Sequence, residues 1–359
     1  MRAWGIVAGA LLLLVVLWDA FETIVLPRRV TRRLRLARLF YRSTWPPFRE
    51  LGRLRRPGAA RENFLSVFGP LSLLLLLGLW ATGLVVGFAL LHWGLGTRLQ
   101  LPPGMAGFAA SLYFSGTTLF TIGLGDVAAT SEIGRFLTVL EGGTGLGFLA
   151  LVIGYLPILS QAFSRREVNI SLLDARAGSP PTAAELLRRH AHPDGGEGLA
   201  QLLDEWERWS ADLLETHISF PVLAFYRSQH ENQSWVAALT TVLDVCALII
   251  AGLEPGPRRT ARLTYAMARH AVVDLSRVFY QPPKSPNPDR LPAEELGKLR
   301  AALIATGRTL PAEKRVEEKL TRIRETYEPY VNALGEFLLM PLPRWSAPER
   351  LRDNWERTV

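Results

Sequence analysis

Four apolar stretches dominate the first 160 residues of the chain: Trp4 to Leu26, Phe64 to Trp93, Phe108 to Phe120, and Phe136 to Leu159. Three of them reach the roughly 20 residues that a helix needs to cross a bilayer. The stretch 108–120 is too short to cross and suits about three to four turns of helix. The pattern therefore predicts three membrane-spanning helices and one short helix between the last two.

After residue 163 the chain becomes polar and charged, with apolar residues at helical spacing and no convincing run of alternating, strand-like residues. Thr182 and Glu185 have the spacing of a capping box at a helix start. The breakers Pro255-Gly256-Pro257 and the proline-rich stretch 282–288 would separate further helices. We therefore predict an all-α membrane protein with an all-α cytosolic domain at its C-terminus.

The apolar stretch 235–253 has two interpretations. It is long enough to approach a membrane span, but Asp244 lies at its centre, where an acid costs roughly 3 kcal/mol on insertion. Crossing would also place the arginines that follow outside, against the usual charge bias. We favour a buried helix of the cytosolic domain, and a membrane-embedded helix remains the alternative.

The net charge of +8 is concentrated in one segment, Arg28 to Arg61, which contains 12 arginines and one acid, Glu50. A basic segment between two apolar spans predicts a cytoplasmic loop that contacts anionic lipid headgroups rather than nucleic acid. The N-terminus would then lie outside, and the first helix would be retained rather than cleaved. Asp19 and Glu22, near the end of that helix, are expected to pair with the basic segment.

The composition argues against several other functions. A single cysteine, Cys246, excludes an intramolecular disulfide framework. Residues 145–150 mimic a dinucleotide fingerprint but follow no predicted strand, so the match fails its context test. No phosphate loop, nucleophile motif or metal-spaced set of ligands is evident after residue 163. We predict that the chain is not an enzyme; a membrane-anchored ligand sensor that acts through the cytosolic domain remains an alternative.

The run Thr117 to Asp126, with the sequence Thr-Thr-Leu-Phe-Thr-Ile-Gly-Leu-Gly-Asp, carries the most specific chemistry. Gly123 and Gly125 permit backbone angles that residues with a Cβ resist, so successive carbonyls can point the same way and replace water around a dehydrated potassium ion. Irregular backbone at membrane depth is tolerated only around a protein-lined pathway, and the negative end of the preceding half-helix favours a cation there. These features predict a pore.

This run resembles the filter of potassium channels with two transmembrane helices and one pore loop per subunit; the matching residues are Thr118, Thr121, Gly123, Gly125 and Asp126. The resemblance covers about a hundred residues. It implies a potassium-channel pore domain at 63–163, between an N-terminal helix with its basic segment at 1–62 and a cytosolic domain at 164–359. Its parts would be an outer helix at 64–93, a re-entrant pore helix at 108–120, the filter at 121–126 and an inner helix at 133–163.

Carried over to this sequence, the resemblance implies that carbonyl oxygens of Thr121, Ile122, Gly123 and Leu124 bind K⁺, with the Thr121 hydroxyl. Asp126 would lie at the outer mouth, and a homotetramer in the plasma membrane would close the ring of ligands. Potassium is the permeant ion, and no cofactor is expected. Leu124 replaces the commoner tyrosine, as in two-pore-domain potassium channels, and a non-selective cation pore remains an alternative.

Pore-helix residues would support the filter. Tyr113 and Phe114 stand where many family members have a Trp pair, and Thr117 stands where some members have Glu; Thr118 belongs to the filter pattern itself. With these residues the resemblance implies that the filter loses polar support and relies on packing.

Three residues of the predicted inner helix are candidates for gating or ion attraction. Gly145 lies where family members keep a hinge glycine, and it would serve either as that hinge or as a site of close helix packing. Pro157 would kink the helix at the intracellular gate or mark its exit from the membrane. Glu141 would either attract cations into the cavity or hydrogen-bond the pore helix as a buried group.

Overall fold

A computed structural model describes residues 2–26, 35–191, 195–230 and 232–346. Within these ranges the chain forms two compact units. The first contains Met1–Pro47 with Pro70–Ser160, and the second contains Phe48–Gly69 with Gln161–Val359. Residues 48–69, which the sequence analysis divides between the N-terminal segment and the pore domain, therefore pack with the C-terminal helices.

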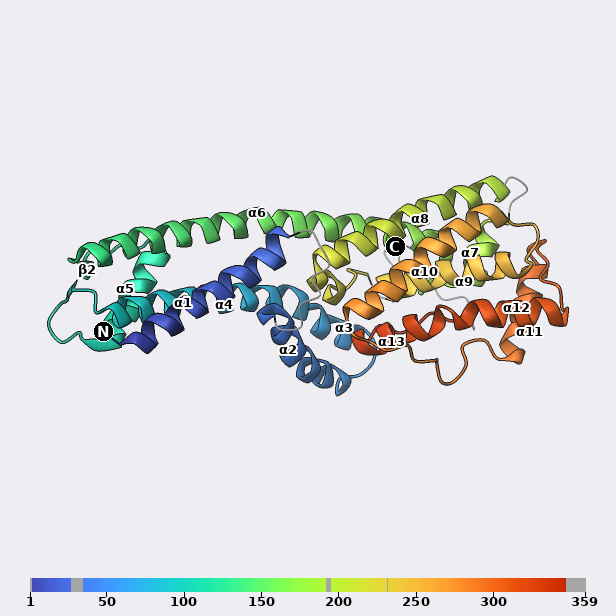
Figure 1. Ribbon diagram of the computed structural model, residues 1–359. Coiled ribbons are helices and arrows are strands. Elements are labelled where there is room, and N and C mark those ends of the chain that lie inside the picture. The colour runs from blue at the N-terminus through green and yellow to red at the C-terminus, as the bar shows by residue number, and fades with distance from the viewer. Residues whose placement is uncertain (1, 27–34, 192–194, 231, 347–359) are drawn as a thin grey trace. The chain divides into compact units, whose positions relative to one another are not determined.

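Long apolar helices build the first unit, and Figure 1 labels them. Among the described residues, three helical spans are long and apolar enough to cross a membrane: Ala3–Val25, Ala59–Leu95 and Glu132–Ala177. A short antiparallel pair of strands flanks the segment between the last two. The elements are α1 (Ala3–Ala20), the π-helix η1 (Phe21–Val25), the first part of α2 (Leu36–Arg53), α4 (Phe68–Leu95), β1 (Leu99–Gln100), α5 (Gly107–Leu119), β2 (Ala128–Ala129) and α6 (Glu132–Ala177).

Helix α6 is longer than the apolar pattern predicts. It continues past residue 163 to Ala177, because the polar residues that follow the apolar stretch contain no helix breaker. Gly178, with φ of +84°, comes directly after the end of α6. Pro157 lies inside α6 without ending it, which is common for proline in transmembrane helices.

The N-terminal helix α1 packs closely against α4. A methyl group added to Gly9 would lie 2.7 Å from the carbonyl oxygen of Gly87, so only glycine allows the two backbones to approach this closely. At the other end of α1 the buried Asp19 accepts hydrogen bonds from Trp80 Nε1 at 3.0 Å and from the backbone N–H of Ala37 at 2.9 Å. The N-terminal helix is therefore an integral part of the first unit.

The expected pairing of the helix acids with the basic segment is confirmed at Arg35. Its Nε lies 3.4 Å from Glu22 Oε2 and 3.9 Å from Asp19 Oδ1. The arginines at positions 28, 29, 32 and 33 lie outside the described residues.

In the described residues, helices form the second unit around the buried helix α9, with one isolated β-bridge between Glu254 and Thr309. Every residue of α9 except Ile250 is buried, and α7, α8, α10, α12 and α13 all contact this helix. The segment 235–251 is thus a helix covered by protein, as predicted. The elements of this unit are α3 (Ala59–Ser66), α7 (Ala183–Arg189), α8 (Gly195–Ser219), the 3₁₀ helix η2 (Pro221–Phe225), α9 (Trp235–Ala251), α10 (Arg258–Val278), α11 (Ala293–Ile304), α12 (Lys314–Glu325) and α13 (Glu328–Leu338).

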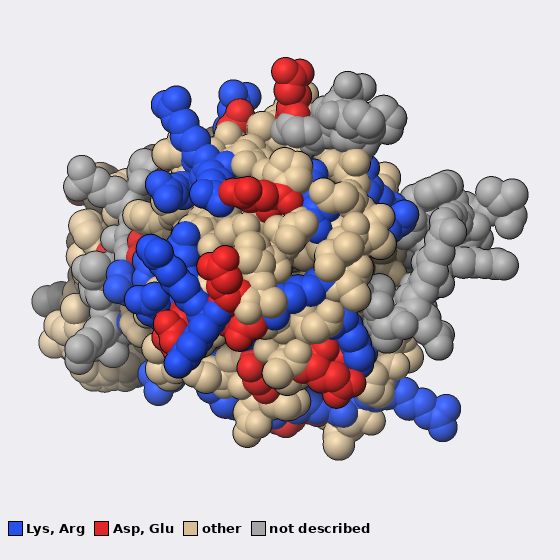
Figure 2. All heavy atoms as spheres, turned by 90° about the vertical axis from the view of Figure 1, so that its right-hand side faces the viewer, with Lys and Arg blue, Asp and Glu red and all other residues tan. Residues whose placement is uncertain are grey.

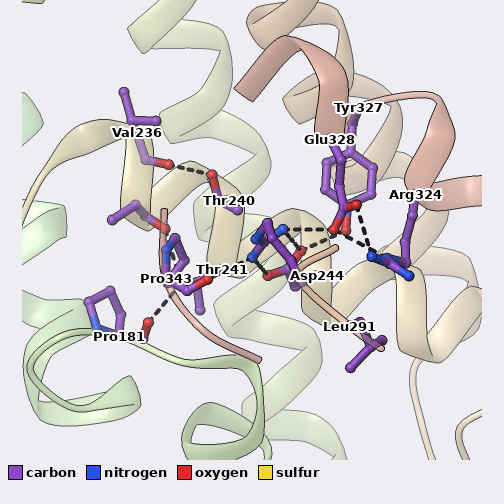
Figure 3. Close-up of polar contacts among 12 residues, drawn as sticks. Pro181, Val236, Thr240, Thr241, Asp244, Leu291, Arg324, Tyr327, Glu328 and Pro343 are labelled. Atoms are coloured by element: carbon purple, nitrogen blue, oxygen red, sulfur yellow. Dashed lines mark hydrogen bonds and ion pairs between the residues drawn. The ribbon is translucent and has the colours of Figure 1, made fainter. Parts of the chain in front are cut away.

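Asp244, the acid that argues against a membrane span, is paired inside this core (Figure 3). Arg290 donates to its carboxylate at 2.6 Å, and the Tyr327 hydroxyl donates at 2.6 Å. Glu328 accepts from Arg290 at 2.9 Å and from Arg324 at 3.0 Å. Although burial opposes it, the neighbouring carboxylates hold the pKa of Arg290 above its usual value. A buried network therefore replaces the solvation of these charges.

Outside the core, positive and negative side chains are interspersed over the face of the molecule that Figure 2 shows. This face corresponds to the side of Figure 1 on which α11 and α12 lie. Mixed charge of this kind is typical of a surface in contact with water.

Acidification is expected to destabilise the second unit through His217. This residue is buried, its Nδ1 lies 2.8 Å from the carbonyl oxygen of Leu213, and its Nε2 lies 3.3 Å from Arg166 Nη1. Burial and the Arg166 guanidinium hold the pKa of His217 well below its ordinary range. The folded protein therefore keeps the ring neutral while the unfolded chain takes up a proton below about pH 6.5.

Below about pH 6.5, proton uptake by His217 in the unfolded chain should lower the free energy of unfolding by about 1.4 kcal/mol for each pH unit. The fall should end where the folded protein also takes up the proton. Thermal unfolding followed by tryptophan fluorescence between about pH 7 and about pH 5.5 measures this slope. His217→Gln should lower this slope by the contribution of one proton, about 1.4 kcal/mol per pH unit. An identical slope in the two proteins would show that His217 is charged in the folded state.

Candidate functional site

The chain turns out of α5 into an extended segment whose N–H groups point back to that helix. Thr121 N donates to Thr118 O at 3.0 Å, and Ile122 N donates to Thr117 O at 2.8 Å. Gly123 N also donates to Thr117 O, at 3.3 Å. These bonds fix the start of the segment on the end of α5 and occupy its donors.

The sign of the backbone angle φ alternates along this segment. Thr121, Gly123 and Gly125 have φ of +57°, +58° and +78°, whereas Ile122 and Leu124 lie on the negative side. In an ordinary strand successive carbonyl groups point to opposite sides of the chain. Where the sign of φ alternates from residue to residue, successive carbonyl groups can point to the same side. Positive φ is accessible to glycine and costs a residue such as Thr121 of the order of 1–3 kcal/mol. This alternation is the backbone geometry that a row of converging carbonyl ligands requires.

The carbonyl oxygens of residues 121–124, which we name the carbonyl row, are free to bind another group. The hydrogen bonds of the described residues include none accepted by these oxygens. Residues 121–126 are all exposed in a single chain, and the side chains of Ile122 and Leu124 are 58% and 65% exposed. Carbonyl oxygens are suitable ligands for a dehydrated alkali cation.

One polar contact supports the end of the segment. The Tyr113 hydroxyl on α5 donates to Asp126 Oδ2 at 2.9 Å, so the expectation that the filter relies on packing is incomplete. Thr117 does not take part, because its hydroxyl donates to Phe114 O of its own helix at 2.9 Å. Phe114 is buried, with its ring 5.2 Å from the ring of His92. The family pattern has tryptophan at this position and so does not indicate the contact, whereas the phenol of Tyr113 is long enough to reach Asp126.

Gly145 on α6 contacts the end of α5. A methyl group at this position would overlap the carbonyl oxygen of Leu119 and lie 2.8 Å from its carbonyl carbon. By contrast, methyl groups at Gly142, Gly143 and Gly147 would meet nothing within 4 Å in the described chain. Close packing therefore explains Gly145 in a single chain, and its role as a hinge stays a prediction.

Gly145→Ala is expected to destabilise the first unit by about 1–3 kcal/mol, because the added methyl must push α6 and α5 apart. Gly143→Ala is the matched control, since its methyl would enter open space. Thermal unfolding of the purified protein in detergent compares the two variants. Equal unfolding temperatures would contradict the packing of α6 against Leu119.

Glu141 is fully buried and faces an ionisable residue that the family pattern does not include. Glu141 Oε2 lies 3.3 Å from Nε2 of His92, which is also fully buried. This geometry is that of a buried group next to the pore helix rather than of an acid exposed to a cavity. The signal was present in the sequence, because His92 is the single ionisable residue between Pro70 and Leu95, and ionisable residues inside apolar spans are usually functional.

Comparison with known proteins agrees with this geometry. Residues 75–160 match a family model described as an ion channel, from inside α4 through α5 and the carbonyl row into α6. The chain is 28% identical over 260 residues to "Uncharacterized membrane protein YdjJ" of Bacillus subtilis (strain 168), across 70% of this chain and 73% of that protein. No solved structure matches the chain. The chain is thus an all-α membrane protein in which residues 75–160 are similar to the ion-channel family.

Proposed function

We propose that this protein is a potassium-selective channel and that the carbonyl row is its selectivity filter. The observation that supports this most directly is the alternating sign of φ along residues 121–125, in a segment whose carbonyl oxygens at 121–124 accept no hydrogen bond from the described residues. Such oxygens replace the water shell of a dehydrated potassium ion. Conduction through them is passive and needs no chemical turnover and no cofactor.

A homotetramer would complete the ligand shell. One chain supplies one carbonyl row, and a closed ring requires symmetric copies around a common axis. The exposed apolar side chains of Phe120, Ile122 and Leu124 support this assembly, because they are 57%, 58% and 65% exposed in a single chain. Neighbouring copies would cover them.

The topology that we propose places the N-terminus outside and the C-terminal unit in the cytoplasm, in the plasma membrane. The segment Arg28 to Arg61 would then contact anionic lipid headgroups. Helix α2 supports this contact, since it carries the exposed Leu39 and Leu51 together with several arginines. The C-terminal unit would set the gate or the assembly, and Pro157 and Gly145 would be the points at which α6 bends.

Ion flux tests the proposal. Purified protein in liposomes is expected to release potassium down its gradient and to be blocked by barium, which competes for the same carbonyl ligands. Equal release of sodium and potassium would indicate a non-selective cation channel instead. Absence of flux for either ion, in liposomes with verified incorporation, would contradict a channel function.

A further inference from the structure

Three helices of the first unit bring polar side chains together behind the carbonyl row. His92 comes from α4, Ser115 from α5 and Glu141 from α6, and all three are buried. His92 Nε2 and Glu141 Oε2 are 3.3 Å apart. The Ser115 hydroxyl lies near the same carboxylate, although their geometry falls short of a direct hydrogen bond. We name these three residues the polar clamp.

A protein that needed only stability would not be expected to bury the polar clamp. Both Glu141 oxygens, His92 Nε2 and Ser115 Oγ are buried without a hydrogen-bond partner among the described residues. Buried polar groups that lack such partners are destabilising, and apolar residues of similar volume would often pack as well or better. The His92 ring is nevertheless held in place, because its Nδ1 lies 3.1 Å from Thr97 Oγ1. Costly polar groups in a fixed orientation at membrane depth indicate a function.

The clamp includes a contact between α5 and α6, and a second contact between these helices lies one helical turn further along. Glu141 faces Ser115, and four residues further along α6 Gly145 packs on Leu119, which is itself four residues after Ser115. Residues four apart lie on one face of a helix, so the two contacts form successive rungs between these helices. The second rung ends at the last residue of α5, two residues before the carbonyl row begins. If α6 were displaced at Glu141, α5 would therefore move with it. The start of the carbonyl row, which follows α5, would then be displaced as well.

We infer that His92 and Glu141 are positioning residues for ion selectivity: with Ser115 they hold α5 so that the carbonyl row keeps the spacing that potassium requires. This inference rests on the proposed channel function. The clamp acts through α5 and does not contact the permeant ion. It links the outer helix, the pore helix and the inner helix at one point behind the filter.

Selectivity, measured separately from stability, distinguishes positioning from a structural role. Glu141→Leu removes the carboxylate that lies 3.3 Å from His92 Nε2 and is expected to raise the ratio of sodium to potassium flux about tenfold, which corresponds to some 1.4 kcal/mol. Glu141→Gln keeps hydrogen-bonding capacity in the same shape and should restore most of the selectivity. The double variant Glu141→Leu with His92→Leu removes the two ionisable groups of the clamp and leaves Ser115, so its thermal stability should recover while its flux ratio stays raised.

The flux ratio is measured in liposomes for the full-length protein, together with its unfolding temperature and its oligomeric state. Val139→Leu, at an exposed position of α6, is the matched control and should behave as the wild type. If Glu141→Leu does not assemble, Ser115→Ala provides the same test, because it removes one hydroxyl and adds no volume; a smaller increase in the ratio is expected.

Wild-type selectivity in the double variant, or in Ser115→Ala where that variant replaces it, would overturn the inference and show that the clamp is only structural. That outcome would leave the channel proposal intact. A wild-type protein that conducts neither ion would instead remove the proposed function, so the two failures can be told apart.

Discussion

Replacing Gly123 with alanine is expected to lower potassium flux at least about tenfold and to leave the protein folded. Gly123 has φ of +58°, where a residue with a Cβ is disfavoured by about 1–2 kcal/mol. Alanine would relieve this strain by moving to negative φ. This change would end the alternation in the sign of φ and turn one carbonyl group away from the carbonyl row. Because every subunit would carry the change, we expect liposome potassium flux to fall at least about tenfold, the effect of some 1.4 kcal/mol.

Gly104→Ala is the matched control for this experiment. Gly104 also has a positive φ, +87°, with nothing within 4 Å of an added methyl group, but it lies in the loop before α5. The backbone penalty is therefore similar and the carbonyl row is untouched, so its flux should equal that of the wild type. Undiminished flux through Gly123→Ala would show that residues 121–124 do not form the conduction path.

Removing the carboxylate of Asp244 is expected to lower the free energy of unfolding of the second unit by about 3–5 kcal/mol, the usual cost of breaking a buried ion pair. Asp244→Ala leaves the Arg290 guanidinium, which is 9% exposed, with Glu328 as its remaining carboxylate partner. The Tyr327 hydroxyl loses its acceptor as well. Chemical denaturation followed by tryptophan fluorescence measures the change.

An exposed ion pair of the same unit supplies the control for Asp244. Asp212 and Arg165 lie 3.8 Å apart, with side chains 41% and 58% exposed. Exposed pairs contribute about 0–1 kcal/mol, so Asp212→Ala should change stability little. Equal losses in the two variants would contradict the view that the Asp244 network is a buried substitute for solvation.

The parts of the fold that depend on local sequence could be predicted. The three spans and α5 follow from the length of their apolar stretches, which is a property of each segment alone. The backbone of residues 121–126 could be predicted in part, because Gly123 and Gly125 readily adopt the positive φ found there, whereas the positive φ of Thr121 has no such signal in the sequence. One residue was enough to predict that 235–251 is a helix buried in protein. Asp244 lies at the centre of this apolar helix, and an acid there indicates a partner inside protein rather than lipid.

Contacts between distant segments could not be predicted in the same way. Glu141 was visible as an unusual acid, but only the fold shows that His92 of another helix faces it. Gly9 was one glycine among many until its approach to Gly87 identified it as a packing site for α1. The end of α6 was placed where hydrophobicity ends, whereas a helix ends where its backbone conformation changes, here just before Gly178.

The reversal potential of the purified protein in a planar bilayer tests the central claim most directly, with potassium on one side and sodium at equal concentration on the other. A filter built from the carbonyl row predicts a potential displaced far from zero toward the potassium equilibrium potential, because potassium carries the current. A reversal potential at zero would contradict potassium selectivity, and the absence of any current would contradict the pore itself.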